Sequence, residues 1–123
     1  MKESVIIFFE RIFPSANMVL IKDQLPTLID TGFGSDVKET EQLLKEAGVS
    51  PKALHLIVNT HYHSDHVGGN YHLQKNYGVP IAAHKWETAL INSNNHEACS
   101  AVWLDQPVEQ YRVDTKWIHH NQL

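Results

Sequence analysis

The chain has 123 residues, the size of one ordinary domain, and a chain of this length buries roughly two-thirds of its unfolded surface on folding. Its hydrophobic content of 42%, charged content of 20% and formal net charge of -4 exclude an intrinsically disordered segment. They also argue against a nucleic-acid partner, because the sequence contains no basic run that would track phosphate groups.

Two local features concern membranes and the compartment. The apolar run over residues 5–9 stops at Glu10 and Arg11, so it is too short for a membrane span and poorly suited to a signal peptide. Cys99 is the only cysteine, which rules out an intrachain disulfide and suits a reducing compartment. We therefore expect a cytoplasmic protein with no membrane partner, in which Cys99 is a small buried hydrophobic residue.

Three short segments rich in β-branched and aromatic residues predict the first strands of the fold. They are residues 4–13, 17–22 and 27–30, with a turn over residues 23–26. Connections this short cannot cross over between parallel strands, so the segments predict an antiparallel meander. The third strand ends in Asp30-Thr31-Gly32.

A helix is predicted next, over residues 36–47. One face of this helix would carry Val37, Thr40, Leu44 and Ala47. Ser35 can cap its start, and Gly48 directly after its end favours termination there.

Strands and helices alternate through the rest of the chain. Residues 54–60 (LHLIVNT) form a nearly continuous apolar run, as expected of a strand covered on both faces. After it we predict a helix over residues 65–77, a strand over 79–83, a short helix starting near Lys85 and a strand over 111–118.

Four groups able to bind a metal lie within six consecutive residues, 61–66 (HYHSDH). His61 and His63 follow the end of a buried strand, where open α/β sheets place their ligands. Residues two apart in an extended segment point the same way, so His61, His63 and Asp65 can converge. His66 then enters as the chain turns into the helix. Surface histidines in a polar loop are the competing interpretation, but this density of ligands favours a metal site.

The composition of this cluster limits which metal it suits. Imidazole and carboxylate ligands without a thiolate favour zinc and also permit iron, manganese or cobalt. Asp65 and His66 approach from a different local geometry, which favours a second ion nearby. Gly68 and Gly69 each cost a helix about 1 kcal/mol, so we expect the first helical turn to pack closely against neighbouring backbone or to leave room for ions and substrate.

Residues 61–69 (HYHSDHVGG) match the HxHxDH signature of the metallo-β-lactamase fold superfamily, and residues 28–32 (LIDTG) resemble the strand end that precedes it there. The order of elements resembles that family from residue 5 to about residue 84. The resemblance implies an α/β fold, α+β in some schemes, that forms one αββα-type half of a four-layer sandwich. Residues 1–123 would then be a single partial domain, the N-terminal half of the family's domain.

The resemblance also implies an activity, that of a metallo-hydrolase. His61 and His63 would bind a first ion, and Asp65 and His66 a second, so the cofactor would be one or two zinc ions, with iron or manganese as substitutes. A metal-bound hydroxide would attack an ester, thioester, lactone or amide in a small-molecule substrate. Asp65 would also be catalytic, orienting the attacking group or moving its proton.

Residues outside the cluster receive more modest interpretations. Asp30 either braces the motif by hydrogen bonding or is a plain turn-former, and the sequence leaves both open. His84 resembles a non-ligand histidine of the family and is expected to be structural. His55, His72 and His96 are expected to be exposed or satisfied locally, and the tryptophans (Trp86, Trp103, Trp117) to lie in the core or at an interface. His119 and His120 are expected to lie on or beside a strand, with a ligand role as the less favoured alternative.

The chain departs from the family in one large respect. The family's second half supplies a further His, a bridging carboxylate and a last His, and nothing in residues 85–123 reproduces those elements. A lone half would leave one sheet face uncovered, which predicts either self-association or a missing C-terminal half. A non-catalytic metal-binding fragment or assembly module is therefore the alternative to a hydrolase, and a redox relative with two irons would need further domains.

Overall fold

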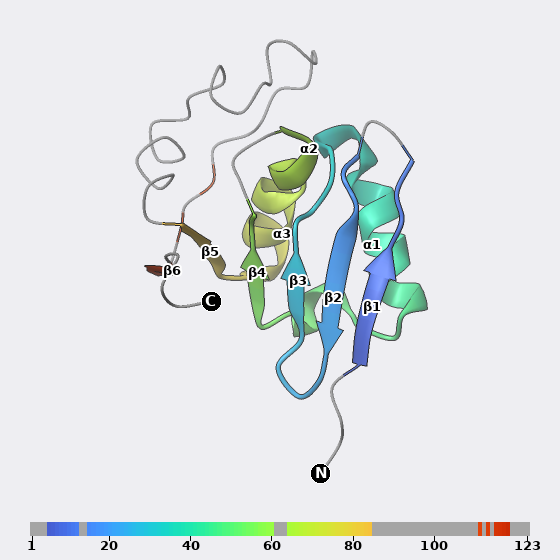
Figure 1. Ribbon diagram of the computed structural model, residues 1–123, viewed down its shortest axis with the longest axis horizontal. Coiled ribbons are helices and arrows are strands. Elements are labelled where there is room, and N and C mark those ends of the chain that lie inside the picture. The colour runs from blue at the N-terminus through green and yellow to red at the C-terminus, as the bar shows by residue number, and fades with distance from the viewer. Residues whose placement is uncertain are drawn as a thin grey trace.

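The computed structural model describes residues 5–12, 15–60, 64–84, 111, 113 and 115–118, and these residues contain one mixed sheet (Figure 1). Its strands lie side by side in chain order: β1 (Val5–Phe9), β2 (Met18–Lys22), β3 (Thr27–Ile29), β4 (Leu56–Val58), β5 (Ile81–His84) and β6 (Thr115–Ile118). The first three strands are antiparallel, which confirms the predicted meander. From β3 onward the neighbours are parallel, and helical segments connect β3 to β4 and β4 to β5.

Helices α1 and α3 lie on one face of the sheet (Figure 1), and the core lies between them and the strands. The helical elements are the 3-10 turns η1 (Gly34–Asp36) and η2 (Pro51–Ala53) and the helices α1 (Val37–Glu46), α2 (Ser64–Val67) and α3 (Asn70–Tyr77). Alternate strand residues supply the sheet side of the core: Met18, Leu20, Leu28, Ile57 and Ile81 are completely buried. Leu44 of α1 and Leu73 of α3, also completely buried, supply the helix side. The longest described helix, α1, has 10 residues, so none of the described helices is long enough to cross a membrane.

The start of α1 differs from the prediction. Thr40 and Leu44 are buried on the expected face, and Gly48 ends the helix with a φ of 84°. Ser35, however, lies inside the preceding 3-10 turn, and the N-cap residue is Asp36. The Asp36 side chain makes no capping bond, because its carboxylate accepts a 2.6 Å hydrogen bond from Ser15 Oγ instead. A tertiary contact therefore replaced the local cap.

The helix predicted over residues 65–77 is two helices, which corrects that expectation. The break falls at Gly68 and Gly69, between α2 and α3. A Cβ atom on Gly68 would lie only 2.1 Å from Gly34 N and 2.4 Å from Phe33 C. The predicted close packing against neighbouring backbone is therefore confirmed, and Gly68 N also donates a 2.7 Å hydrogen bond to Gly32 O.

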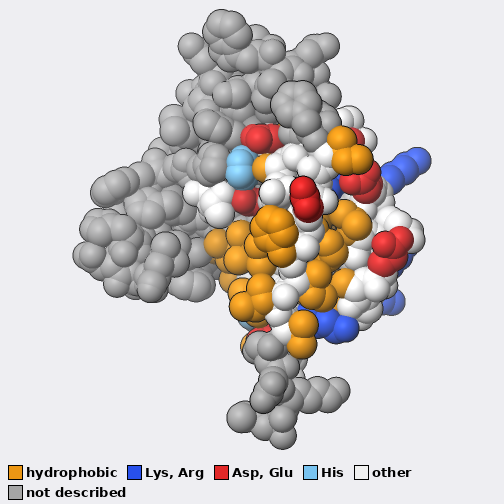
Figure 2. Space-filling view, turned by 45° about the vertical axis from the view of Figure 1, so that its right-hand side comes forward, with side chains coloured by type: hydrophobic (Ala, Val, Ile, Leu, Met, Phe, Trp, Pro, Cys, Tyr) orange, Lys and Arg blue, Asp and Glu red, His pale blue; other side chains and the backbone are white. Residues whose placement is uncertain are grey.

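The sheet face opposite the helices is apolar and partly open. Ile6 and Phe8 of β1 keep 71% and 62% of their surface exposed. The strand register places Val19 and Ile21 of β2 beside them, and Ile29, Leu56 and Val58 continue the same face across β3 and β4. Figure 2 shows hydrophobic side chains gathered in one patch on the side of the molecule that it presents.

Burial along β4 corrects the expectation of a strand covered on both faces. Ile57, on the helix side, is completely buried, whereas Leu56 and Val58 are half-buried. Within the described residues, only the helix side of this strand is fully covered. The strand predicted over residues 111–118 is the shorter β6, which begins at Thr115. Tyr111 and Val113 before it are buried. The helix predicted near Lys85 lies outside the described residues.

Candidate metal site

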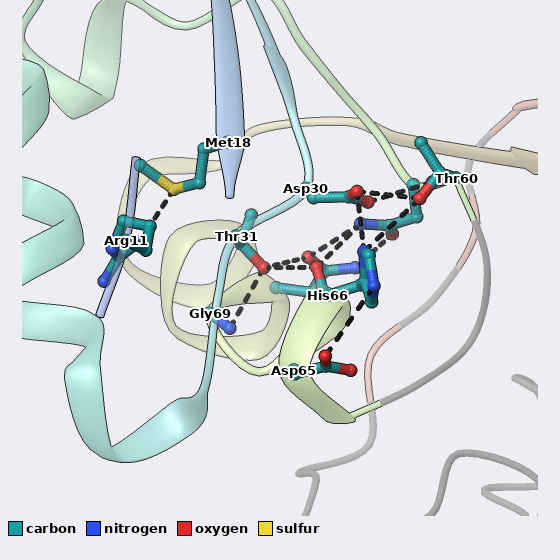
Figure 3. Close-up of polar contacts among 10 residues, drawn as sticks. Arg11, Met18, Asp30, Thr31, Thr60, Asp65, His66 and Gly69 are labelled. Carbon is teal, nitrogen blue, oxygen red and sulfur yellow. Dashed lines mark hydrogen bonds and ion pairs between the residues drawn. The ribbon is translucent and has the colours of Figure 1, made fainter. Parts of the chain in front are cut away.

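The described part of the HxHxDH motif begins at α2, beside the carboxyl ends of β3 and β4 (Figures 1 and 3). Asp65 and His66 are the two predicted ligands in this part. His61 and His63 lie outside the described residues, so their role as ligands stays a prediction. Thr60 at the end of β4 and Asp30 at the end of β3 are the groups around which the site is built.

Asp30 is both a turn-former and a brace, so both interpretations of it hold. Its φ of 64° is left-handed, a conformation that Asp tolerates better than most residues. The Oδ1 atom accepts a 2.9 Å hydrogen bond from Thr60 N, and Oδ2 accepts a 2.7 Å bond from Thr60 Oγ. Oδ2 also lies 2.8 Å from His66 Nδ1. This carboxylate therefore ties the end of β4 to the ring in α2.

The Asp30 contact fixes the orientation and tautomer of the His66 ring. A carboxylate can only accept, so the ring proton is on Nδ1 and Nε2 carries the lone pair that a metal needs. Carboxylate support of this kind behind a ligand histidine is the usual partner arrangement in metal sites. Nε2 points toward Asp65, whose Oδ2 atom lies 3.8 Å away (Figure 3).

The separation between these two donor atoms suits a shared cation. Two ligand atoms about 2.1 Å from one ion at a tetrahedral angle are about 3.4 Å apart, close to the 3.8 Å between His66 Nε2 and Asp65 Oδ2. No third His, Cys, Asp or Glu completes a ligand group within the part of the chain that the structure describes. The chemistry and spacing of these two donors are compatible with a metal ion, and the role of Asp65 and His66 as ligands stays a prediction.

The electrostatics around His66 favour a positive charge. Burial lowers the pKa of His66, but the hydrogen bond to Asp30 and the charges of Asp30 and Asp65 raise it, and the net shift is upward. Two carboxylates around one half-buried imidazole thus attract cations to this corner of the fold. A bound metal ion would satisfy the same field.

A buried polar network below the motif was missed by the sequence analysis. The carbonyl of His66 accepts from Thr31 N at 2.8 Å and from Asn59 Nδ2 at 3.3 Å. Asn59 Oδ1 accepts a 2.5 Å bond from Asn70 Nδ2, and Thr31 Oγ donates to Asn70 Oδ1 at 2.7 Å. All three side chains are buried, and polar residues directly before and after the motif were the available signal.

The remaining predicted residues lie away from this site or outside the described part of the chain. His72 Nε2 lies 2.9 Å from Glu41 Oε2, which is the local satisfaction expected for a lone histidine, and His55 is exposed. His84 ends β5, but its side chain is not described. The residues outside the described part are His96, His119, His120, Trp86, Trp103 and Cys99, and for Trp117 only the backbone is described.

The sequence of the chain is similar to known proteins. The family model described as the metallo-beta-lactamase superfamily matches residues 11–95. Over 52 residues, 41% of this chain, the sequence is 40% identical to a hydroxyacylglutathione hydrolase from Pelagibacter ubique, of which the match covers 21%.

Solved structures show the same fold. The subclass B3 metallo-beta-lactamase BJP-1 of Bradyrhizobium japonicum superposes with a TM-score of 0.73 and 23% identity, over 84% of this chain and 39% of that one. The FEZ-1 metallo-beta-lactamase of Legionella gormanii superposes with a TM-score of 0.69 and 17% identity, over 80% of this chain and 38% of that one. The expected fold is confirmed, and the chain spans about two-fifths of the length of these structures.

Proposed function

This chain belongs to the metallo-beta-lactamase superfamily, and from that premise we propose that it carries the metal-binding motif of a zinc-dependent hydrolase. The observation that carries the proposal is the Asp30–His66–Asp65 arrangement, in which one carboxylate orients the imidazole and the other lies 3.8 Å from its Nε2 atom. The substrate class is a small molecule with an ester, thioester, lactone or amide bond. The names of its relatives, a hydroxyacylglutathione hydrolase and metallo-beta-lactamases, support acyl transfer to water.

The ligands we propose are His61, His63, Asp65 and His66, for one or two ions. Zinc is the preferred metal because the set has nitrogen and oxygen donors and no thiolate, and iron or manganese can take its place. A divalent ion bound there supplies a nucleophile at neutral pH and polarises the group under attack.

The chain's own residues have distinct parts in this proposal. Asp30 Oδ2 holds the proton on His66 Nδ1, which keeps Nε2 directed at the site. The Asp65 side chain is 31% exposed, so water can reach its carboxylate, and we assign it the second role of accepting a proton from the attacking water. The bonds that Thr31 N and the side-chain amide of Asn59 donate to the His66 carbonyl keep α2 in place.

Zinc titration of the full chain tests this proposal. We expect saturable binding of one or two Zn²⁺ ions per chain in competition with a chromophoric chelator. The ion bound by Asp65 and His66 should be lost in His66→Ala and bound about 10-fold to 100-fold more weakly in Asp30→Asn. His55→Ala is the matched control, because His55 is exposed and lies just before β4, at the opposite end of that strand from the motif. Equal zinc binding by wild type and His66→Ala would refute the assignment.

A second candidate function is favoured by the open apolar sheet face. A metal-binding fragment or assembly module, without turnover, would use this face to pair with a second copy or with a further half of the fold. Ile6 and Phe8, the most exposed residues of the face, support such pairing because they are large apolar side chains in contact with solvent. A metal content near two ions per chain together with hydrolysis of a generic ester would support the hydrolase. A metal content of one ion or fewer without turnover would support the module.

We also propose a compartment and domain boundaries for the chain. We place the protein in the cytoplasm, supported by the single cysteine, and we treat residues 1–123 as one partial domain. Nucleic acid is not among the partners we propose, since the net charge is -4.

A further inference from the structure

The loop between β1 and β2, residues 10–17, reaches the metal motif. The structure describes it at residues 10–12 and 15–17. Ala16 N donates a 3.1 Å hydrogen bond to the carbonyl of Asp65. Beside it, Ser15 Oγ accepts from Phe33 N at 3.0 Å and donates to Asp36 Oδ2 at 2.6 Å. The loop is therefore attached at once to the segment after β3, to the start of α1 and to α2.

Arg11 anchors the other side of the same loop. Its side chain is 0% exposed, which is unusual for a guanidinium, and it lies beside Met18 (Figure 3). Nη1 donates to Thr40 Oγ at 2.9 Å and lies 2.9 Å from Met18 Sδ, and Nε lies 3.3 Å from Glu39 Oε1. Nη2 is buried without a partner among the described residues. A buried guanidinium with one donor that no described residue accepts is costly, so Arg11 is weak evidence of a purely stabilising role.

Gly32, the last residue of Asp30-Thr31-Gly32, packs closely against Arg11 and Ser15 of this loop. Its φ is +72°, and a Cβ atom there would lie 2.9 Å from both Arg11 Nη1 and Ser15 Oγ. A side chain at this position would be strained and would displace both anchors. The glycine thus serves the contact between the loop and the site.

Helix α2 cannot hold its own orientation. It has 4 residues, far fewer than a stable isolated helix needs, so bonds from outside must fix it. The carbonyl of His66 accepts from Thr31 and Asn59, whereas the carbonyl of Asp65 accepts from Ala16 of the β1–β2 loop. The two ligands therefore have separate anchors.

We propose that the described parts of the β1–β2 loop, residues 10–12 and 15–17, position the metal site: Arg11 and Ser15 hold Ala16 against the backbone carbonyl of Asp65 and so place the Asp65 side chain. Arg11 and Ser15 are positioning residues that touch no metal. This inference rests on the proposed function, because it assumes that Asp65 is a ligand. It assigns to this loop a part of the site that lies outside the HxHxDH motif.

The test compares Ser15→Ala and Arg11→Met with wild type in the full chain. We expect each variant to bind Zn²⁺ about tenfold more weakly and to shift the visible spectrum of bound Co²⁺, because the Asp65 oxygen is displaced. Measurements are made well below the unfolding temperature. Glu41→Gln is the matched control: it removes bonds between α1 and α3 and lowers stability, and we expect its Zn²⁺ affinity and Co²⁺ spectrum to be unchanged.

Arg11→Met separates positioning from stability. An apolar side chain of similar length removes the orphan donor, so we expect no loss of thermal stability although zinc binding weakens. A purely structural role would show the reverse, with a lower unfolding temperature and unchanged zinc affinity in the folded protein. That result would overturn the inference.

A double-mutant comparison identifies the ligand through which the loop acts. We expect Ser15→Ala to have no further effect on zinc affinity in an Asp65→Asn background and to keep its effect in an Asp30→Asn background. Equal effects in both backgrounds would overturn the assignment to Asp65. If wild type binds zinc and Ser15→Ala does not change it, this inference fails alone; if wild type binds no zinc, the proposed function fails and the inference with it.

Discussion

Replacing Gly68 by alanine tests the close approach that separates α2 from α3. The added Cβ would lie 2.1 Å from Gly34 N, 2.4 Å from Phe33 C and 2.6 Å from Gly32 O. All three atoms are backbone, so no side chain can rotate away to make room. We expect Gly68→Ala to be one of the most destabilising single-methyl additions in the chain.

The magnitude follows from two contributions. Relieving the three contacts requires the segment after β3 to move by about 1 Å, and overpacking of this kind typically costs about 1–3 kcal/mol. The move also breaks the 2.7 Å bond from Gly68 N to Gly32 O, worth about 1 kcal/mol. Gly68 lies between the helices, so alanine gains little helix propensity in return. The expected loss of unfolding free energy is about 2–4 kcal/mol.

Urea denaturation of Gly68→Ala, Gly69→Ala and Gly78→Ala checks this value. At Gly69 the nearest atoms would be Thr31 O at 2.9 Å and Thr31 Cβ at 3.0 Å, so we expect a smaller loss. At Gly78 nothing lies within 4 Å, and only the φ of +69° opposes alanine, at about 1–2 kcal/mol. The packing argument would be refuted if Gly68→Ala lowered the unfolding free energy no more than Gly78→Ala does.

Two further predictions concern the helix pair and the open face. The Glu41 carboxylate accepts hydrogen bonds from Tyr77 Oη and from His72 Nε2. The bond from Tyr77 is the main cause that lowers the pKa of Glu41 below 4.5. The same bond raises the pKa of Tyr77 above 10.0. The contribution of Glu41 is therefore present above pH 4.5 and lost as pH falls through its folded pKa, while that of Tyr77 is present below pH 10 and lost as pH rises. In urea denaturation the stability difference between wild type and Glu41→Gln should shrink below about pH 4.5; a difference that stays constant down to pH 3 would contradict it. On the open face, we expect sedimentation to show concentration-dependent association of wild type that Phe8→Lys abolishes and Gln24→Lys, at an exposed turn, leaves intact; a monomer at all concentrations would exclude the self-association proposal.

Local patterns predicted most of the elements. Alternating and continuous apolar runs located the strands to within a few residues, because the residues that face the core are the same ones that make the pattern. The pattern failed where tertiary contacts replaced local signals. Ser35 is a good capping residue, yet Asp36 took the N-cap position and used its side chain on Ser15 of another loop.

In the candidate site too, local patterns predicted some features and tertiary contacts decided others. The spacing of His61, His63, Asp65 and His66 is a property of the chain itself, and it was sufficient to predict a metal site and a family. The network of Thr31, Asn59 and Asn70 could not be predicted, since each is an ordinary polar residue until the fold brings it to the His66 carbonyl. Its members are up to 39 residues apart in sequence.

The sequence by itself determined the chemistry that is available: which ligand types are present, how closely they follow one another, and that two glycines come directly after them. Only the tertiary structure decided that Asp30 supports His66, that Gly68 packs against the backbone of Gly34, and that Ala16 bonds to Asp65. The physical reason is that these contacts join β3, the first loop and α2, and the position of one segment against another depends on the packing of the whole core.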